Sequence, residues 1–202
     1  MLAPAVAVRP VRMPEPEIED DELMARIQGA RGARREEAFR RLVRRHASAV
    51  QAVVRSVAGR ESAEDVTQEV FLRVYQARER YVPGPAQFRT WLLRIARNAA
   101  LNARRSRTIR RAGSLDEAGE LSTDEPGPAR VLEERLEAEA VREAVERLPA
   151  GEREMIALRF GQGLSYEEIG AVTGSGAAAL KQKTWRALER LRSLLGAGEE
   201  SS

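Results

Sequence analysis

The sequence predicts an all-α protein of two small helical domains joined by a flexible acidic linker. Apolar residues recur at spacings of three and four along most of the chain, and no sustained alternation typical of a strand interrupts them. A stretch without this period, rich in acidic residues and ending in Gly127 and Pro128, divides the two helical parts. With 202 residues, 43% of them hydrophobic, the chain has enough material for two modest cores.

The first domain is expected at residues 25–110, after a disordered tail at 1–24 that contains four prolines and the acidic run EIEDDE. Its first long helix begins near Glu36 and ends at Gly59. The apolar residues of that helix form one continuous stripe: Phe39, Leu42, Val43, His46, Val50, Val53, Val54 and Val57.

A second helix begins at Ser62, whose hydroxyl together with Asp65 resembles an acidic capping box. The segment YVPGPAQ then interrupts the helical pattern, and a third helix follows over FRTWLLRIARNAALNARRSR. One side of this helix is apolar: Phe88, Trp91, Leu92, Ile95 and Ala99. From Arg94 to Arg111 it carries seven arginines and no acidic residue, which is typical of a nucleic-acid contact.

The flexible linker is expected at residues 111–133, the second domain at 134–196 and a short tail at 197–202. Ser165 and Glu168 form a capping box that starts a short helix ending at Gly174, and TGSG supplies a tight turn before a longer helix. One side of the longer helix is apolar, and Lys181, Gln182, Trp185, Arg186 and Glu189 lie opposite it. This division is typical of a recognition helix. The alternative is that Trp185 packs on a neighbouring helix and the charges are simply solvated.

Catalysis and metal binding have little support in the composition. There is no cysteine, and the single histidine, His46, lies on an apolar stripe and is expected at the edge of the core. Thiolate, Ser–His–Asp and multi-histidine sites are therefore excluded, and we expect no enzyme activity, no catalytic residue, no metal and no cofactor. No apolar run approaches the roughly 20 residues of a membrane span, so we expect a cytoplasmic protein without membrane insertion.

Three segments in order give a specific resemblance: AEDVTQEVFLRVY, FRTWLLRIARNAALN and LPAGEREMIALRFGQGLSYEEIGAVTGSGAAALKQKTWRALERL. Together they resemble bacterial RNA polymerase sigma factors of the sigma-70 family, in the extracytoplasmic-function (ECF) group. The resemblance implies a protein that binds core RNA polymerase, directs it to promoters and promotes promoter melting. It also implies an anti-sigma factor as a further partner.

The resemblance assigns three sets of residues. Core polymerase would be bound by Asp65, Gln68 and Glu69. The minus-ten promoter element, including its melted non-template strand, would be bound by Arg94, Arg97, Asn98, Arg104 and Arg105. The loop Tyr81–Gln87 matches the family segment that takes up a flipped base. The duplex minus-thirty-five element would be bound by Lys181, Gln182, Lys183, Trp185 and Arg186.

Two other functions compete with this interpretation. A stand-alone helix-turn-helix regulator explains the second domain but not the Trp91–Asn98 segment. A helical adaptor that binds only protein leaves the arginine run unexplained. Recruitment by core polymerase distinguishes the sigma factor from both.

Overall fold

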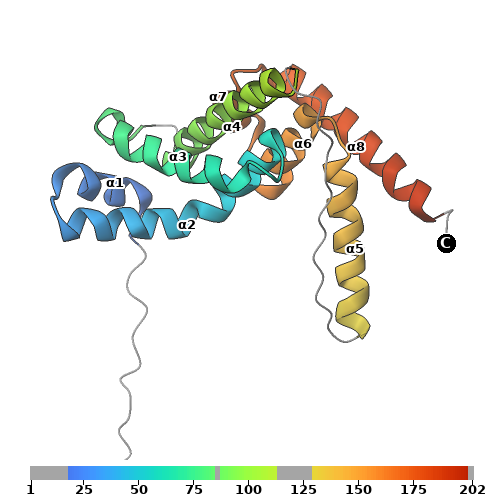
Figure 1. Cartoon of the computed structure of the whole chain (residues 1–202), viewed down its shortest axis with the longest axis horizontal. Helices are drawn as coiled ribbons and strands as arrows, with labels where there is room; N and C mark the ends of the chain where they lie inside the picture. The colour runs from blue at the N-terminus through green and yellow to red at the C-terminus, as the bar shows by residue number, and fades with distance from the viewer. Residues whose placement is uncertain (1–17, 85–86, 113–128, 200–202) are drawn as a thin grey trace, which may run out of the picture.

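The computed structural model describes residues 18–84, 87–112 and 129–199. Within these ranges the chain forms helices and turns and no strand, so the predicted all-α class is confirmed. The first half contains four α-helices and a 3-10 turn: α1 (Asp20–Gly29), α2 (Ala33–Ala58), α3 (Ala63–Ala77), η1 (Arg78–Arg80) and α4 (Phe88–Ala112) (Figure 1). The second half contains α5 (Ala129–Glu146), α6 (Ala150–Ile156), the π-helical turn η2 (Ala157–Gly161), α7 (Tyr166–Thr173) and α8 (Ala177–Glu199).

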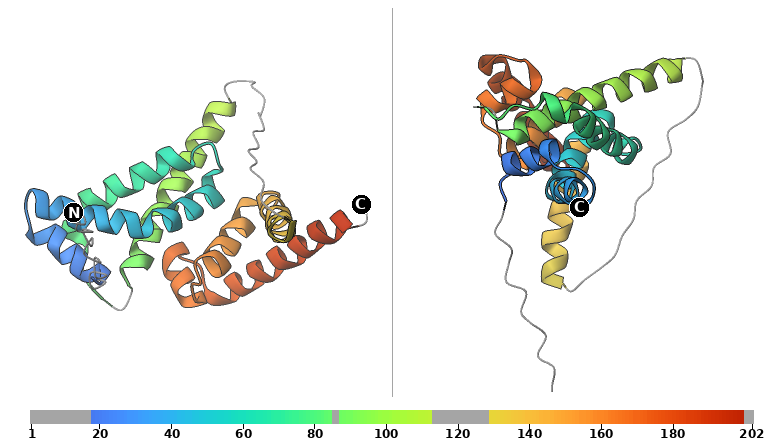
Figure 2. Two further views of the ribbon diagram at one scale, coloured as in Figure 1. Left: turned by 90° about the horizontal axis from the view of Figure 1, so that it is seen from below. Right: turned by 90° about the vertical axis from the view of Figure 1, so that its left-hand side faces the viewer.

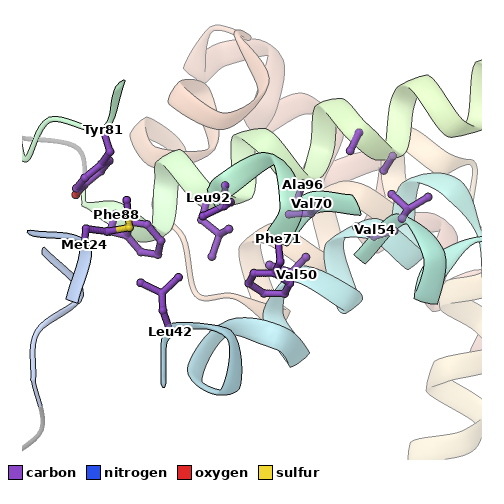
Figure 3. Close-up of a cluster of buried hydrophobic side chains, with 14 of the residues drawn as sticks. Met24, Leu42, Val50, Val54, Val70, Phe71, Tyr81, Phe88, Leu92 and Ala96 are labelled. Carbon is purple, nitrogen blue, oxygen red and sulfur yellow. The ribbon is translucent and has the colours of Figure 1, made fainter. Parts of the chain in front are cut away.

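The first core lies between α1, α2, α3 and α4 (Figure 3). The stripes predicted for the long helices meet there, with Leu42, Val50, Val70 and Leu92 at most 1% exposed. Helix α2 ends where Gly59 takes a φ of 89°, a backbone conformation that residues with a Cβ rarely adopt.

Helix α1 was not predicted. Residues 20–24 were expected to belong to a disordered tail, but they form the first half of this helix. Its Leu23, Met24 and Ile27 are at most 1% exposed, in the first core. Asp20, Asp21 and Glu22 of the run EIEDDE occupy its first turn, where negative charge is favourable against the positive end of the helix dipole. The part of the predicted tail at residues 1–17 lies outside the described residues.

The linker prediction also differs from the structure at both ends. Helix α4 continues to Ala112, and α5 begins at Ala129, so the helices extend into the predicted range 111–133 from both sides. Residues 113–128 lie outside the described part of the chain. Helix α5 projects away from the rest of the molecule in Figure 1.

The two predicted capping boxes have different outcomes. At α7 the box is confirmed: the Glu168 N–H donates to Ser165 Oγ at 3.2 Å, and the Ser165 N–H donates to Glu168 Oε2 at 2.7 Å. At α3 the prediction was wrong, because the Ser62 side chain makes no capping bond. Ser165 has the extended backbone that aims a side chain at the first amides of a helix, whereas Ser62 has a helical backbone, with ψ of −1°.

A second core joins the two halves of the molecule. It contains Val53 from α2 and Leu93 from α4, each 0% exposed, together with residues of the second half: Met155, Leu158, Leu164, Ile169, Val172 and Leu180. The sequence indicated two separate helical units, and it gave no sign that they share apolar contacts. Figure 2 shows the two groups of helices lying against one another.

Candidate nucleic-acid and polymerase interfaces

Helices α7 and α8 form the predicted helix-turn-helix, joined by residues 174–176. Gly174 ends α7 with a φ of 75°, the left-handed conformation that glycine adopts without strain. The turn then passes close to α7, since a Cβ placed on Gly170 would lie 3.1 Å from the Ser175 carbonyl oxygen. Two glycines therefore set how closely α8 follows α7.

Helix α8 has the apolar back and polar front expected of a recognition helix. Leu180, Thr184 and Ala187 are at most 3% exposed, and the Thr184 hydroxyl donates to the Leu180 carbonyl oxygen at 2.9 Å. Four of the predicted minus-thirty-five residues are exposed: Lys181, Gln182, Trp185 and Arg186. Trp185 is 63% exposed, so it does not pack on a neighbouring helix as the alternative required.

The fifth predicted residue, Lys183, lies beside the apolar back rather than on the front. It is half-buried, and a Cβ added to Gly151 of α6 would lie 3.4 Å from its ammonium nitrogen. Lys181 contacts α7, with its ammonium 5.9 Å from the centre of the Tyr166 ring. The two lysines therefore have different surroundings, and only Lys181 shares the exposed face with Trp185.

The predicted minus-ten residues of helix α4 differ in their exposure. Arg94, Asn98, Arg104 and Arg105 are exposed. Arg97 instead forms an ion pair with Glu154 of α6, and the two side chains keep only 19% and 7% of their exposure. The structure therefore brings four of the five predicted minus-ten residues to the surface and turns the fifth towards the second half of the molecule.

Further hydrogen bonds connect the two halves of the molecule. Arg89 of α4 donates to the carbonyl oxygen and the side-chain oxygen of Gln162, at 2.7 Å and 2.9 Å. Arg153 of α6 donates to the Ser56 carbonyl oxygen at 2.9 Å. Sequence reasoning missed these residues, because one arginine or glutamate on a helix carries no sign of a partner many residues away.

The predicted polymerase-binding residues share an exposed side of α3. Asp65, Gln68 and Glu69 are all exposed, and Glu69 pairs with Arg73 one turn later at 2.6 Å. Leu72 extends this side and is 63% exposed. The face therefore combines hydrogen-bond acceptors with an apolar side chain.

The loop between η1 and α4 begins at a buried residue, and its other described residues are exposed. Tyr81 is 4% exposed, while Val82, Pro83 and Gly84 are exposed, as is Gln87 before α4. Residues 85–86 of the predicted base-binding loop lie outside the described residues.

His46 is buried at the edge of the first core, as predicted. Its Nε2 lies 2.8 Å from Asp20 Oδ2, and Arg45 donates to the other oxygen of that carboxylate at 2.6 Å. Burial acts to raise the pKa of Asp20, but these hydrogen bonds and charges outweigh it and hold that pKa below its ordinary value. Across the described ranges, no acidic and histidine side chains group as metal ligands, and no helix has the length and apolarity of a membrane span.

Comparison with known proteins finds the same two units. The family model of sigma-70 region 2 matches residues 42–109, and that of sigma-70 region 4 matches residues 138–191. The chain is 34% identical over 190 residues to the RNA polymerase sigma factor CnrH of Cupriavidus metallidurans, covering 90% of this chain and 98% of the relative. It is 33% identical over 156 residues to the ECF sigma factor SigE of Mycolicibacterium smegmatis, covering 76% and 60%.

Solved structures agree with the fold. The structure of CnrH in complex with the cytosolic domain of CnrY is 29% identical, covers 88% of this chain and 97% of its own, and gives a TM-score of 0.61. The sigma factor RpoE of Bartonella quintana, solved with the anti-sigma factor NepR, is similar in fold, with a TM-score of 0.64 at 24% identity over 79% of this chain and 98% of its own. The chain therefore belongs to the sigma-70 family, in its extracytoplasmic-function group, as a sigma factor that directs core RNA polymerase to promoters for transcription initiation.

Proposed function

We propose that this sigma factor divides its work among three surfaces, of which the exposed side of α3 binds core polymerase. Asp65 and Gln68 offer acceptors to basic residues of the partner, and Leu72 gives the contact an apolar centre. Glu69 becomes a third acceptor for polymerase when a basic residue of the partner replaces Arg73 or shares its carboxylate. Exposed pairs of this kind are weak, so the exchange costs little.

The second surface is α4, which binds the minus-ten element. The single observation that supports it best is the run of exposed arginines on a helix that contains no acidic residue in its first turn or beyond. Arg94, Arg104 and Arg105 neutralise phosphates, and Asn98 lies among them with an amide that both donates and accepts. The loop that begins at Tyr81 takes up an unpaired base, whose binding offsets the lost stacking without nucleotide hydrolysis.

The third surface is the front of α8, which binds the minus-thirty-five element in duplex form. Lys181 and Arg186 supply charge for phosphates, Gln182 supplies an amide for base edges, and Trp185 supplies contact area. Lys183 reaches DNA only at the edge of this surface, because it lies towards α6.

Full use of α4 requires the two halves to separate. Arg97 is held by Glu154, so its guanidinium becomes available to a phosphate only when α6 moves away. We therefore assign the junction to the free protein and an open arrangement to the complex with polymerase and promoter, in which the segment between Ala112 and Ala129 tethers the halves.

An anti-sigma factor is the remaining partner that we assign. CnrH, to which this chain is similar over most of its length, has been solved with the cytosolic domain of CnrY. We propose a comparable partner here, and we place the protein in the cytoplasm, where core polymerase acts. The proposed role needs no cofactor and no enzymatic activity of its own.

The test combines the purified chain with bacterial core polymerase on a panel of promoters, with permanganate footprinting of opened strands. Asp65→Ala is expected to weaken core binding about tenfold. Asn98→Ala is expected to retain core binding and to reduce opening by a similar factor. Gln51→Ala, at an exposed glutamine of α2, is the matched control and should change neither. Equal opening by the Asn98 variant and the wild type would contradict the role of α4.

A further inference from the structure

Helix α1 contacts the root of the minus-ten loop, although it lies outside the residues that the region 2 model matches. Its buried side places Met24 in the first core with Tyr81 and Phe88, at the end of the cluster where the loop leaves η1 (Figure 3). The apolar contacts attach the helix to the domain. The polar contacts on the same helix are more specific.

Gln28 bonds the two backbone carbonyls that enclose the turn before the loop. Its side-chain amide donates to the carbonyl oxygens of Arg78 and Tyr81, both at 2.8 Å. Because a glutamine amide has two N–H groups, both donors are used at this one place. The Tyr81 N–H also donates to the Arg78 carbonyl oxygen, at 3.1 Å. Gln28 therefore binds the backbone at the first residue of η1 and at the residue directly after η1, where the chain enters the loop.

Asp21 binds the hydroxyl of Tyr81, the residue whose carbonyl oxygen Gln28 binds. The Tyr81 hydroxyl donates to an oxygen of the Asp21 carboxylate. Burial, followed by this bond and the nearby acidic charges, raises the pKa of Tyr81, so the phenol keeps its proton and remains a donor. One helix thus binds both the carbonyl oxygen and the hydroxyl of Tyr81.

The Tyr81 ring transmits this position to the far end of the loop. Its centre lies 5.4 Å from that of Phe88 and 5.1 Å from that of Trp91, at the start of α4. The two ends of the loop are therefore in contact through aromatic rings. Directly after Tyr81, Val82 is 78% exposed. Val82 directly follows the carbonyl that Gln28 binds.

We propose that α1 supports the start of the minus-ten loop, Tyr81–Gly84, and that Gln28 and Asp21 are positioning residues that fix Tyr81 so that this part of the loop selects an unpaired base. The inference rests on the proposed function of the loop. It gives the Gln28 amide a role beyond filling space, because this amide satisfies two part-buried carbonyl oxygens at the start of the loop.

The experiment uses holoenzyme assembled from the full chain and core polymerase. The probe is a forked DNA library whose single-stranded non-template segment is randomised, so no promoter has to be known. Bound molecules are sequenced, and base enrichment is calculated at each position. Gln28→Met keeps the apolar stem and removes both donors, and Tyr81→Phe keeps the ring and removes the hydroxyl. Arg26→Met, at an exposed residue of the same helix, is the control.

We expect the two test variants to keep core affinity within about twofold and to lose about tenfold in base enrichment at one position of the segment. A purely structural role would instead lower core affinity and enrichment together. Wild-type enrichment in both test variants would overturn the inference.

A Val82→Ala variant separates this result from failure of the proposed function. If Val82→Ala flattens the profile and Gln28→Met does not, only the role of α1 is wrong. If neither variant changes the profile, or the wild type enriches no base, the loop does not select a base, and the proposed function of the loop fails with the inference.

Discussion

Removing the carboxylate of Glu154 is the sharpest perturbation of the junction between the two halves. In Glu154→Gln the Arg97 guanidinium stays in a site where its side chain keeps only 19% of its exposure, without its counter-charge. Breaking a buried pair in this way typically costs 3–5 kcal/mol. Because Arg97 retains some contact with water, we take the lower end, about 3 kcal/mol. This corresponds to a shift of about 100-fold in an equilibrium.

In Glu154→Gln this change in the equilibrium should appear as separation of the two halves rather than as unfolding of either half. The first core does not contain Arg97 or Glu154, and α4 separated from α6 exposes Arg97 to water. We therefore expect the halves to part before either unfolds. The chain has no cysteine, so Ser48→Cys on α2 and Ser193→Cys on α8, both exposed, accept a dye pair without background labelling. Energy transfer between the dyes should fall in Glu154→Gln.

Two further variants make the result specific. Glu22→Gln removes a carboxylate from an exposed pair with Arg26 on α1 and should leave energy transfer unchanged. The double variant Arg97→Met with Glu154→Leu replaces both charges by apolar groups, which is often neutral at buried pairs, and should restore the closed arrangement. Unchanged transfer in Glu154→Gln would refute the reasoning, as would equal opening in the double variant.

Three other predictions address the recognition helix, the first core and the capping box. Trp185→Ala should weaken binding of holoenzyme to duplex minus-thirty-five DNA while thermal unfolding stays unchanged, because the ring is 63% exposed; a lowered melting temperature would contradict this. Leu92→Ala should lower the free energy of unfolding by about 2–5 kcal/mol in urea titration, since the side chain is 0% exposed and leaves a cavity. A loss below that range would show that the core collapses around the site. Glu168→Gln keeps an acceptor in the capping box but removes its charge. Hydrogen bonds from the Ser165 N–H and then its hydroxyl hold the pKa of Glu168 below 4.5, so the charge stabilises the fold above that pH. The stability gap between wild type and variant should be constant near neutral pH and close as pH falls through the lowered pKa, and a gap that persists in acid would exclude charge as its cause.

The helices of the first core were predictable because a helix with one buried side has apolar residues at spacings of three and four. Leu42, Val50 and Val54 follow that period, and all three are buried. Helix α1 was not predictable in the same way. Its three buried residues, Leu23, Met24 and Ile27, follow a cluster of acidic residues, and that composition favours disorder when it is read without knowledge of the partner helices.

The recognition helix was largely predictable from projection of its residues around a helical axis, whereas the junction between the halves was not. Leu93 lies outside the apolar side predicted for this helix, and it is buried in a core that it shares with residues of α6, α7 and α8. Arg97 fits a run of DNA-binding arginines equally well. Periodicity tells which side of a helix is covered and not what covers it, so contacts between distant helices require the folded structure.

In the function proposed above, Arg97 connects the closed arrangement of the free protein with its affinity for DNA. Glu154 now pairs with the Arg97 guanidinium, and a promoter phosphate would compete with Glu154 for the same group. When only a fraction of the molecules is open, the apparent dissociation constant is the intrinsic constant divided by that fraction. The factor of about 100 that the Arg97–Glu154 pair adds to the preference for the closed arrangement would thus weaken promoter binding by the free chain by up to about 100-fold. Core polymerase removes this penalty if it holds the halves apart. In this proposal Glu154, a residue assigned to no DNA contact, raises the preference of the protein for binding promoters as part of the holoenzyme.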